Sequence, residues 1–303
     1  MKLTGIADEA GAPLERQITA TQALGWDSIE ARFVEVPGFE KGSVHEIPDE
    51  AFDIFASGLE EAGIKVSGVG STIGNWAHSI EDSFEITEGE IERCIARMKR
   101  LDSKIVRVMT YAILKDDDGN VLPEQHADER FTRVAEIKKR FEAAGITPVH
   151  ENCMNYGGMG PGYAMELQAA VPGLKWVYDT GNPVFNRDRN KPEPFPMQDP
   201  WEMWETLREH SVHVHIKDVV WNEEKNECDY CMPGEGDGQV VRVLQDLKDR
   251  GYEGYISIEP HVAAVFHDAD GDAEKDPEAQ AKWLYESYVQ YGEKMKALIA
   301  GLG

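Results

Sequence analysis

The sequence predicts a single α/β domain, a (β/α)8 TIM barrel that spans residues 1–303. Eight short runs rich in β-branched and aromatic residues alternate with eight amphipathic segments, the order expected when parallel strands are wrapped by helices. The connections into the strands are short, whereas many connections out of them are long, as in barrels whose loops share one rim. Four of the runs also stop at a residue that binds divalent metals.

The predicted elements alternate strictly along the chain. The strands are expected over Leu3–Ala7, Ser28–Phe33, Lys65–Gly70, Ile105–Thr110, Thr147–Glu151, Lys175–Asp179, Val212–Lys217 and Tyr255–Glu259. The helices are expected over Ala12–Leu24, Asp49–Ala62, Ile86–Leu101, Asp128–Ala144, Tyr163–Val171, Pro200–Glu209, Gln239–Asp249 and Ala279–Leu298. Glycines in the turns between a helix and the next strand supply the left-handed conformation that ends a helix, at Gly25, Gly63, Gly145 and Gly251.

The loops that leave the strands are the variable part of this plan and are expected to build the active site. They cover Val34–Ile47, Ser71–Phe84, Tyr111–Glu124, Gly181–Asp199, Val219–Asp237 and Pro260–Lys275.

The composition narrows the classes of function. With 31 basic and 56 acidic residues the net charge is −25, so most of the surface would repel a nucleic acid. No run approaches 18 apolar residues, which argues against a membrane span. The four cysteines do not form a disulfide framework and the first residues carry no apolar signal region, so we expect a cytoplasmic protein.

Four strand ends carry the chemistry. The segments end in Glu151, Asp179, a histidine pair at His213 and His215, and Glu259. A buried carboxylate needs a cation or hydrogen-bond donors, so four such residues at one end of a barrel predict a Glu/Asp/His/Glu metal site. Carboxylate oxygens with one imidazole suit hard cations, and we expect Mn²⁺, with Mg²⁺, Co²⁺ or Zn²⁺ as alternatives.

Several motifs resemble the xylose isomerase-like barrel superfamily of sugar isomerases and epimerases, which also includes metal-dependent apurinic endonucleases. The resemblance covers nearly the whole chain, and beside the four metal strands it rests on residues 5–9, 28–32, 66–71 and 233–236. It implies that Glu151, Asp179, His215 and Glu259 hold the metal. His215 is preferred over His213 because the family's imidazole stands two residues before the Lys217-Asp218 pair.

The resemblance also implies a reaction. In family members that transfer protons, the two glutamates flank the substrate, so Glu151 and Glu259 are the predicted catalytic residues. The metal polarises a carbonyl and a carboxylate removes the adjacent proton. The predicted contacts to substrate are His150, His213, Lys217, His261, Glu30, Arg32 and Arg107. For His213, Glu30 and the two arginines, packing inside the barrel is the alternative, and for His261 the alternative is a position on the loop surface. Strand alternation turns His150 outward unless the strand is already ending.

The leading hypothesis is therefore a metal-dependent isomerase or epimerase that acts on a ketose or keto-sugar through an enediolate. The alternative is a lyase or deglycosidase that cleaves 3-keto-glycosides by β-elimination at the same site, sometimes with a small partner subunit. An abasic-site endonuclease is disfavoured by the acidic charge and by the few histidines, and a non-catalytic sugar-binding protein is the remaining class. We expect a small-molecule sugar substrate. The sequence does not decide whether the chain forms a homo-oligomer.

Three further segments remain open. Residues 186–191 form the only basic cluster after a metal strand, so they either grip a substrate phosphate or lie as a solvated loop. Residues 157–160 lack the spacing of a nucleotide-binding fingerprint and are expected to shape the pocket floor beside Glu151. Cys228 and Cys231 have the spacing of half a zinc knuckle, but no second cysteine pair follows.

Overall fold

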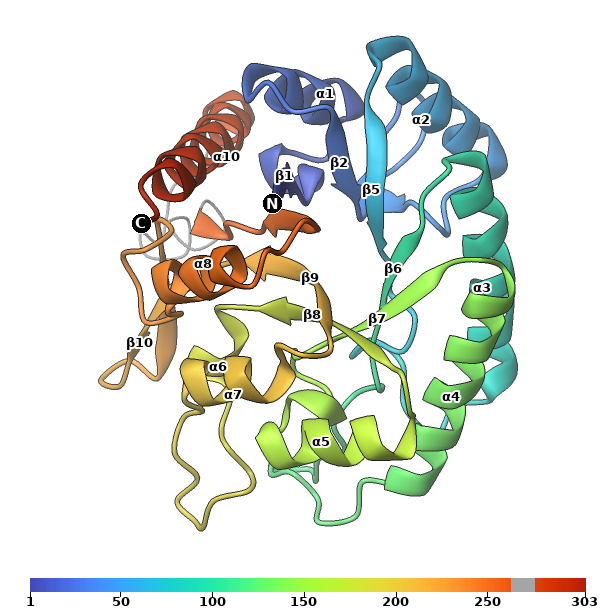
Figure 1. Cartoon of the computed structure of the whole chain (residues 1–303). Helices are drawn as coiled ribbons and strands as arrows, with labels where there is room; N and C mark the ends of the chain where they lie inside the picture. The colour runs from blue at the N-terminus through green and yellow to red at the C-terminus, as the bar shows by residue number, and fades with distance from the viewer. Residues whose placement is uncertain (263–275) are drawn as a thin grey trace.

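The barrel predicted from the sequence is present. The computed structural model describes residues 1–262 and 276–303, so most of the loop predicted over residues 260–275 lies outside the described residues. The barrel strands are β1 (Lys2–Gly5), β2 (Ser28–Ala31), β5 (Lys65–Gly70), β6 (Ile105–Val108), β7 (Thr147–Glu151), β8 (Lys175–Asp179), β9 (Ser211–Ile216) and β12 (Tyr255–Ile258). They form a ring with helices outside it (Figure 1). Three of the eight predicted strand ranges, those of β5, β7 and β8, are reproduced to the residue.

All neighbouring strands of the barrel sheet run parallel, in the order β1-β12-β9-β8-β7-β6-β5-β2. The two ends of this sheet meet through an isolated parallel bridge between Ile6 and Glu30, so the barrel is nearly closed. The four strands with predicted metal ligands, β7, β8, β9 and β12, are consecutive neighbours. Their carboxyl ends therefore lie along one arc of the rim.

The outer layer consists of helices that bury one face against the strands. They are α1 (Leu14–Ala23), α2 (Asp49–Ala62), α3 (Phe84–Arg100), α4 (Ala127–Ala143), α5 (Pro161–Ala170), α7 (Pro200–Leu207), α8 (Val240–Asp249) and α10 (Pro277–Ala300). The four predicted turn glycines all have a left-handed backbone, with φ between 66° and 75°. Within the described residues, no helix is both long and apolar enough to cross a bilayer.

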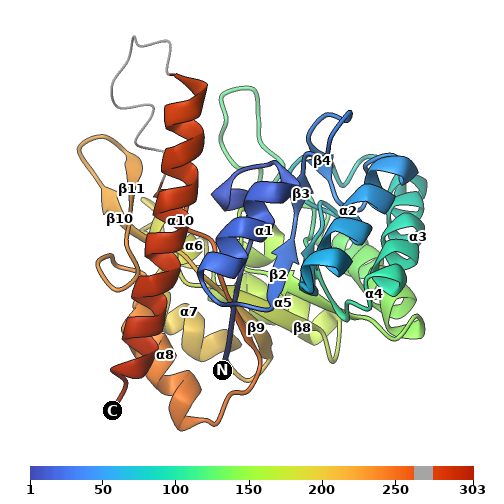
Figure 2. The ribbon, with the colours of Figure 1, turned by 90° about the horizontal axis from the view of Figure 1, so that it is seen from above.

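The long loops on the rim contain short elements that the sequence did not predict. The antiparallel pair β3 (Phe33–Val34) and β4 (Gly42–Ser43) follows β2, and a second pair, β10 (Asp218–Asn222) and β11 (Glu227–Cys231), follows β9. The short helix α6 (Asn182–Phe185) follows β8 directly. In Figure 2 both hairpins project from one side of the barrel and both chain termini lie toward the other.

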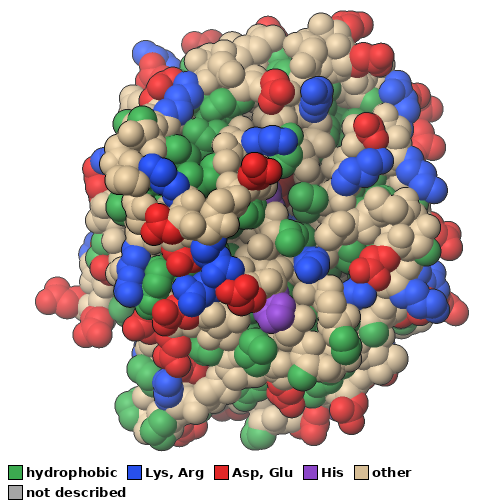
Figure 3. Space-filling model, viewed as in Figure 1, with side chains coloured by type: hydrophobic (Ala, Val, Ile, Leu, Met, Phe, Trp, Pro, Cys, Tyr) green, Lys and Arg blue, Asp and Glu red, His purple; other side chains and the backbone are tan. Residues whose placement is uncertain are grey.

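Charge is spread over the surface. On the face drawn in Figure 3, acidic and basic side chains are interspersed around the edge, and the basic ones form no continuous surface there. Inside the barrel, short polar side chains pair with each other: Thr4 Oγ1 lies 3.3 Å from Ser67 Oγ and donates to the carbonyl of Ser28. A polar interior of this kind can supply hydrogen-bond partners to charged side chains at the rim.

His45, next to β4, is a buried histidine in a cationic environment. Its Nδ1 lies 2.6 Å from Ser43 Oγ and its Nε2 lies 3.2 Å from Thr72 Oγ1. Burial, with Arg97 and Arg93 nearby, lowers the pKa of His45 to about 3. The unfolded chain binds a proton here below about pH 6.5, whereas the folded chain does not, so His45 weakens folding as the pH falls through this range.

We expect His45→Gln to make folding less sensitive to acid. Between pH 7 and pH 5 the free energy of unfolding of the unmodified protein should fall by about 2 kcal/mol more than that of the variant. Urea unfolding at the two pH values measures this difference, and His126→Gln, an exposed histidine, serves as the control. Equal losses in His45→Gln and the unmodified protein would contradict the assignment.

Candidate metal centre

The structure brings the four predicted ligands together. Glu151 and Asp179 are the last residues of β7 and β8, His215 lies in β9, and Glu259 directly follows β12. All four side chains are buried, and each offers one ligand atom such that all of these atoms lie within 4.8 Å of one another. Parallel neighbouring strands of similar register produce this convergence.

Three of the four ligands in this cluster have a buried polar atom without a hydrogen-bond partner. Glu151 Oε2, Asp179 Oδ2 and His215 Nδ1 are buried without a hydrogen-bond partner. His215 Nδ1 faces both glutamates, at 3.6 Å from Glu151 Oε1 and 3.8 Å from Glu259 Oε2. Buried polar atoms are rarely left unsatisfied. These three atoms, together with the nearby Glu259 carboxylate, form a set of three carboxylates and one imidazole nitrogen that fits a divalent cation.

Glu30 orients His215 from inside the barrel. Its carboxylate, at the end of β2, lies 3.0 Å from His215 Nε2 and 2.7 Å from His213 Nε2. Burial raises the pKa of Glu30, but the two imidazoles outweigh it and hold that pKa well below its usual range. The contact directs Nε2 of His215 toward Glu30 and leaves Nδ1 for the ligand cluster, the arrangement in which a carboxylate supports a metal-binding histidine.

We expect Glu30→Gln to weaken metal binding by about 10-fold, because a neutral amide cannot serve both imidazoles as the carboxylate does. Calorimetric titration of the chelator-treated protein with Mn²⁺ measures this loss. Glu90→Gln is the matched control, since Glu90 is also a buried glutamate paired with a histidine, His78, outside the cluster. An unchanged affinity in Glu30→Gln would show that Glu30 does not position His215.

Three cations contact the carboxylates of the cluster. Lys217 Nζ lies 3.1 Å from Asp179 Oδ2 and 3.2 Å from Glu259 Oε2. Arg107 Nη1 lies 3.1 Å from Glu151 Oε2, and Arg32 Nη1 donates to Glu259 Oε1 at 2.7 Å. Burial alone would raise the pKa of both glutamates. The cations outweigh it, so the pKa of Glu151 is about 2 and that of Glu259 lies well below its usual range.

The remaining predicted substrate contacts fall into three positions. Lys217, Arg32 and Arg107 lie beside the ligands, as just described, whereas Glu30 and His213 lie inside the barrel and contact each other. His261 also lies at the site. Its Nδ1 is 3.0 Å from Glu9 Oε1, its Nε2 is 3.6 Å from Glu259 Oε1, and its side chain is 25% exposed.

His150 lies outside the barrel wall, and the structure does not bring it into the site. Its ring packs against Trp176 with centroids 4.6 Å apart, and Trp176 in turn donates to Gln168 of α5. Burial lowers the pKa of His150 to about 3, so the ring is neutral. Because β7 continues through Glu151, strand alternation directs His150 to the face opposite Glu151, and a substrate contact there would require the strand to end earlier.

Other polar residues of the site were missed by the sequence interpretation. Asn182 Nδ2 donates to Glu151 Oε1 at 3.2 Å, and the backbone N–H groups of Gly181 and Asn182 donate to Asp179 Oδ1. Asn152 exchanges two hydrogen bonds with the backbone of Asp179. The sequence does show asparagine or glycine shortly after the strands that carry Glu151 and Asp179. The residue type alone does not predict which side chain it contacts.

The Lys-Asp pair and the glycines of residues 234–238 have a shared structural role. The Asp218 carboxylate accepts backbone N–H groups from Gly234, Gly236 and Gly238 at 2.8 to 3.0 Å. A Cβ atom at Gly236 would lie 2.4 Å from Asp218 Oδ1, so a side chain there would clash. This anchoring fixes the chain that follows Lys217, and with it the rim around the cluster.

The two cysteines do not form a second metal site. Cys228 and Cys231 lie in β11, three residues apart, and pair with Trp221 and Asp218 of β10. Residues three apart in a strand point to opposite faces, so the two thiols cannot share one ion. Both thiols are free.

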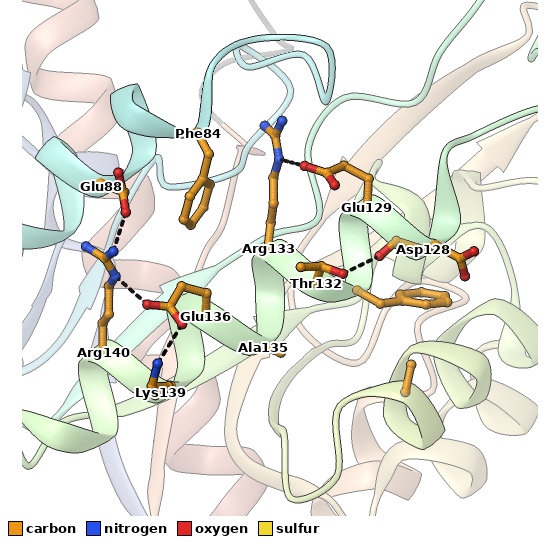
Figure 4. A pocket seen from close by; sticks show the side chains of 12 residues that line it. Phe84, Glu88, Asp128, Glu129, Thr132, Arg133, Ala135, Glu136, Lys139 and Arg140 are labelled. Carbon is orange, nitrogen blue, oxygen red and sulfur yellow. Dashed lines mark hydrogen bonds and ion pairs between the residues drawn. The ribbon is translucent and has the colours of Figure 1, made fainter.

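A hollow of about 870 Å³ lies on the outer wall of the barrel, between helices, and none of the ligand-cluster residues lines it. Figure 4 shows its charged side chains from α3 and α4 paired with one another. Arg140 contacts Glu88 and Glu136, and Arg133 contacts Glu129 at 2.7 Å. Most of the charges in this hollow are therefore already paired with neighbouring side chains.

The family to which the sequence is similar agrees with the barrel and the ligand cluster. Residues 18–287 match the family described as the xylose isomerase-like TIM barrel. The chain belongs to this family. No curated protein matches the sequence.

Solved structures of other xylose isomerase-like barrels share the fold at low sequence identity. D-psicose 3-epimerase from Clostridium cellulolyticum H10, solved with D-tagatose, has a TM-score of 0.65 and 17% identity and covers 99% of each chain. The IOLI protein with a bound zinc atom has a TM-score of 0.66 and 16% identity, covering 100% of this chain and 99% of its own. The probable 3-DHS dehydratase AsbF from Bacillus anthracis has a TM-score of 0.63 and 14% identity, covering 95% and 97%.

Proposed function

We propose that this chain is a divalent-metal-dependent sugar isomerase or epimerase that moves a proton next to the carbonyl of a ketose or keto-sugar. The observation that carries the proposal is the pair of buried glutamates beside His215 Nδ1, at 3.6 and 3.8 Å. They come from the two outer strands of a four-strand arc. Two carboxylates at one ligand cluster provide two groups that can each take up a proton from a substrate and return it.

The ligands would be Glu151, Asp179, His215 and Glu259, and we propose Mn²⁺ as the ion. A bound divalent cation would polarise the substrate carbonyl and acidify the adjacent C–H group. Glu151, held ionised by Arg107, is able to accept a proton, and Glu259 is held ionised in the same way by Lys217 and Arg32. Lys217, Arg32 and Arg107 also present N–H donors to substrate oxygens around the cluster.

The test is incorporation of solvent deuterium. Purified protein with Mn²⁺ is incubated in D₂O with a panel of ketoses and 3-keto-sugars, and NMR follows the loss of the C–H signal next to the carbonyl. We expect exchange into at least one sugar and none after chelation. If the Mn²⁺-loaded protein exchanges no proton of any sugar in the panel, the proposal is wrong.

A second candidate, β-elimination from a 3-keto-glycoside, is favoured by one observation. His261 pairs with Glu9, and its ring packs edge-on against Tyr230 of the β10–β11 hairpin with centroids 5.3 Å apart. Burial lowers the pKa of His261, but Glu9 and Glu259 outweigh it and raise that pKa above its ordinary value. In its protonated form, the His261 imidazole beside Glu259 could donate a proton to a leaving group. Release of the aglycone, instead of a changed stereocentre, would identify this reaction.

A further inference from the structure

A second hollow, of about 490 Å³, opens on the rim next to the ligand cluster. It is formed by the loops after β5, β6, β7 and β8. Phe185, the last residue of α6, connects it to the cluster, since the Lys217 Nζ atom lies 6.0 Å from the centre of the Phe185 ring. Asn155 provides a second connection, because it bridges to Ala112 of the hollow and donates to the carbonyl of Glu151 at 3.1 Å.

A large part of the wall of this hollow is apolar. Trp76 and Met154 contribute large side chains that are 52% and 49% exposed, and Ile113, Val121 and Phe185 complete the wall. Exposed aromatic and thioether groups gathered around one hollow mark a ligand site, because such surface is otherwise withdrawn from water. Sugar hydroxyls would find few partners on these side chains, whereas an aromatic or aliphatic group would gain by contact with them.

The charges at this hollow are all positive. Lys115, Arg187 and Arg189 line it, and no aspartate or glutamate does, although the chain has 56 acidic residues. Within residues 1–262 and 276–303, none of these three cations forms an ion pair with a carboxylate; Arg187 donates to the carbonyl of Phe195 and Arg189 stacks on the Phe195 ring at 4.5 Å. The hollow therefore retains positive charge that can attract an anion.

We propose that this hollow is a subsite for an apolar, aryl-type substituent that carries an anionic group, attached to the sugar whose carbonyl lies at the ligand cluster. The proposal rests on the proposed function, because it assumes a keto-sugar at Glu151 and Glu259. A simple sugar phosphate would satisfy the cations but would leave the walls of Trp76 and Met154 exposed. An acidic aryl glycoside satisfies both features of the hollow.

Three probes test the proposal on the Mn²⁺-loaded protein: the methyl, phenyl and 4-carboxyphenyl glycosides of 3-keto-glucose. Isothermal titration calorimetry gives their affinities, and glucose 6-phosphate is titrated as the alternative ligand. We expect phenyl to bind about 10-fold more tightly than methyl, and 4-carboxyphenyl about 10-fold more tightly than phenyl. Weaker binding of glucose 6-phosphate than of the 4-carboxyphenyl glycoside is also expected.

Variants show which residues produce each of the two gains in affinity, that of phenyl over methyl and that of 4-carboxyphenyl over phenyl. Trp76→Ala should remove most of the gain of phenyl over methyl, and the double variant Arg187→Gln with Arg189→Gln should remove most of the gain of the carboxylate. Ile86→Ala, which truncates an equally exposed apolar side chain on α3, should change neither step. Thermal unfolding of each variant confirms that it is folded, since all these side chains lie at the surface.

Equal affinities of the three glycosides in the unmodified protein would overturn the proposal, and so would tighter binding of glucose 6-phosphate. Failure of the proposed function is recognised separately. In that case none of the glycosides exchanges solvent deuterium, whereas calorimetry still reports whether the aryl and carboxylate groups bind at the hollow.

Discussion

Replacing Glu151 or Glu259 by glutamine is expected to reduce solvent-deuterium exchange into a keto-sugar by about 10³-fold at saturating Mn²⁺. Glutamine has nearly the same shape and still offers an oxygen to a cation, but its amide does not take up a proton at neutral pH. Both carboxylates face His215 Nδ1 at similar distances, so both lie at the proposed reaction centre. NMR-detected exchange, with metal content measured in the same samples, provides the test.

Asp179→Asn is the matched control for a ligand without a proton-transfer role. Asp179 Oδ1 already accepts the N–H groups of Gly181 and Asn182, which leaves only Oδ2 for a cation. This variant should bind Mn²⁺ more weakly, yet recover most of its exchange activity when the metal is in excess. Glu151→Gln and Glu259→Gln should not recover.

The outcome distinguishes two kinds of chemistry. If both glutamine variants regain full exchange at high Mn²⁺, the glutamates act only as ligands and another group transfers the proton. If only one variant is inactive, a single carrier shuttles the proton between neighbouring carbons, as in an aldose–ketose isomerase. Loss in both agrees with an acid and a base on opposite faces of the substrate, as an epimerase requires.

The sequence predicted the barrel and the grouping of the four ligands because both depend on local patterns. Strand runs and turn glycines report the alternation of elements, and parallel strands place their carboxyl ends at one rim whatever the loops do. Glu151 and Asp179 are therefore found together simply because each ends a neighbouring strand. The glycine turns at Gly25 and Gly63 locate the helix ends for the same local reason.

What the sequence did not predict depends on which residues meet across the barrel. Glu30 was expected either to contact sugar hydroxyls or to pack inside the barrel, but the pattern did not reveal its partners, two imidazoles on a strand far away in sequence. The β10–β11 hairpin was predicted as a loop, because its residues show no strict alternation of apolar and polar side chains. The direction of the His150 side chain depends on where β7 ends, and the ends of elements are the least certain part of a sequence pattern.

Lys217 connects the electrostatics of the site to the stability of the fold. Its ammonium group lies between Asp179 and Glu259 and is buried with them. Burial lowers the pKa of Lys217, but Asp179, Glu259 and Glu151 outweigh it and hold that pKa well above its ordinary value. The lysine contacts two oxygens, Asp179 Oδ2 and Glu259 Oε2, that belong to the proposed ligands of the metal. A lysine and a metal ion at this position therefore neutralise the same negative charge.

We expect Lys217→Met to destabilise the chelator-treated protein by about 3 kcal/mol, because two buried carboxylates lose their cation. In excess Mn²⁺ the loss should shrink to a small fraction of this value, since the ion supplies the missing charge. Chelation of the unmodified protein should abolish exchange and lower its stability, by about 4 kcal/mol relative to Mn²⁺ at 1,000 times its Kd. Urea unfolding with and without Mn²⁺ measures all four states.

Lys191→Met is the control, because Lys191 is a half-exposed lysine whose ion pairs with Asp188 and Glu202 lie outside the cluster. It should show the same gain from Mn²⁺ as the unmodified protein. Lys217→Met should instead show a larger gain, because the metal restores charge that only this variant lacks. If Mn²⁺ stabilises both variants equally, Lys217 and the metal do not share the carboxylates, and the ligand set of Glu151, Asp179, His215 and Glu259 would have to be revised.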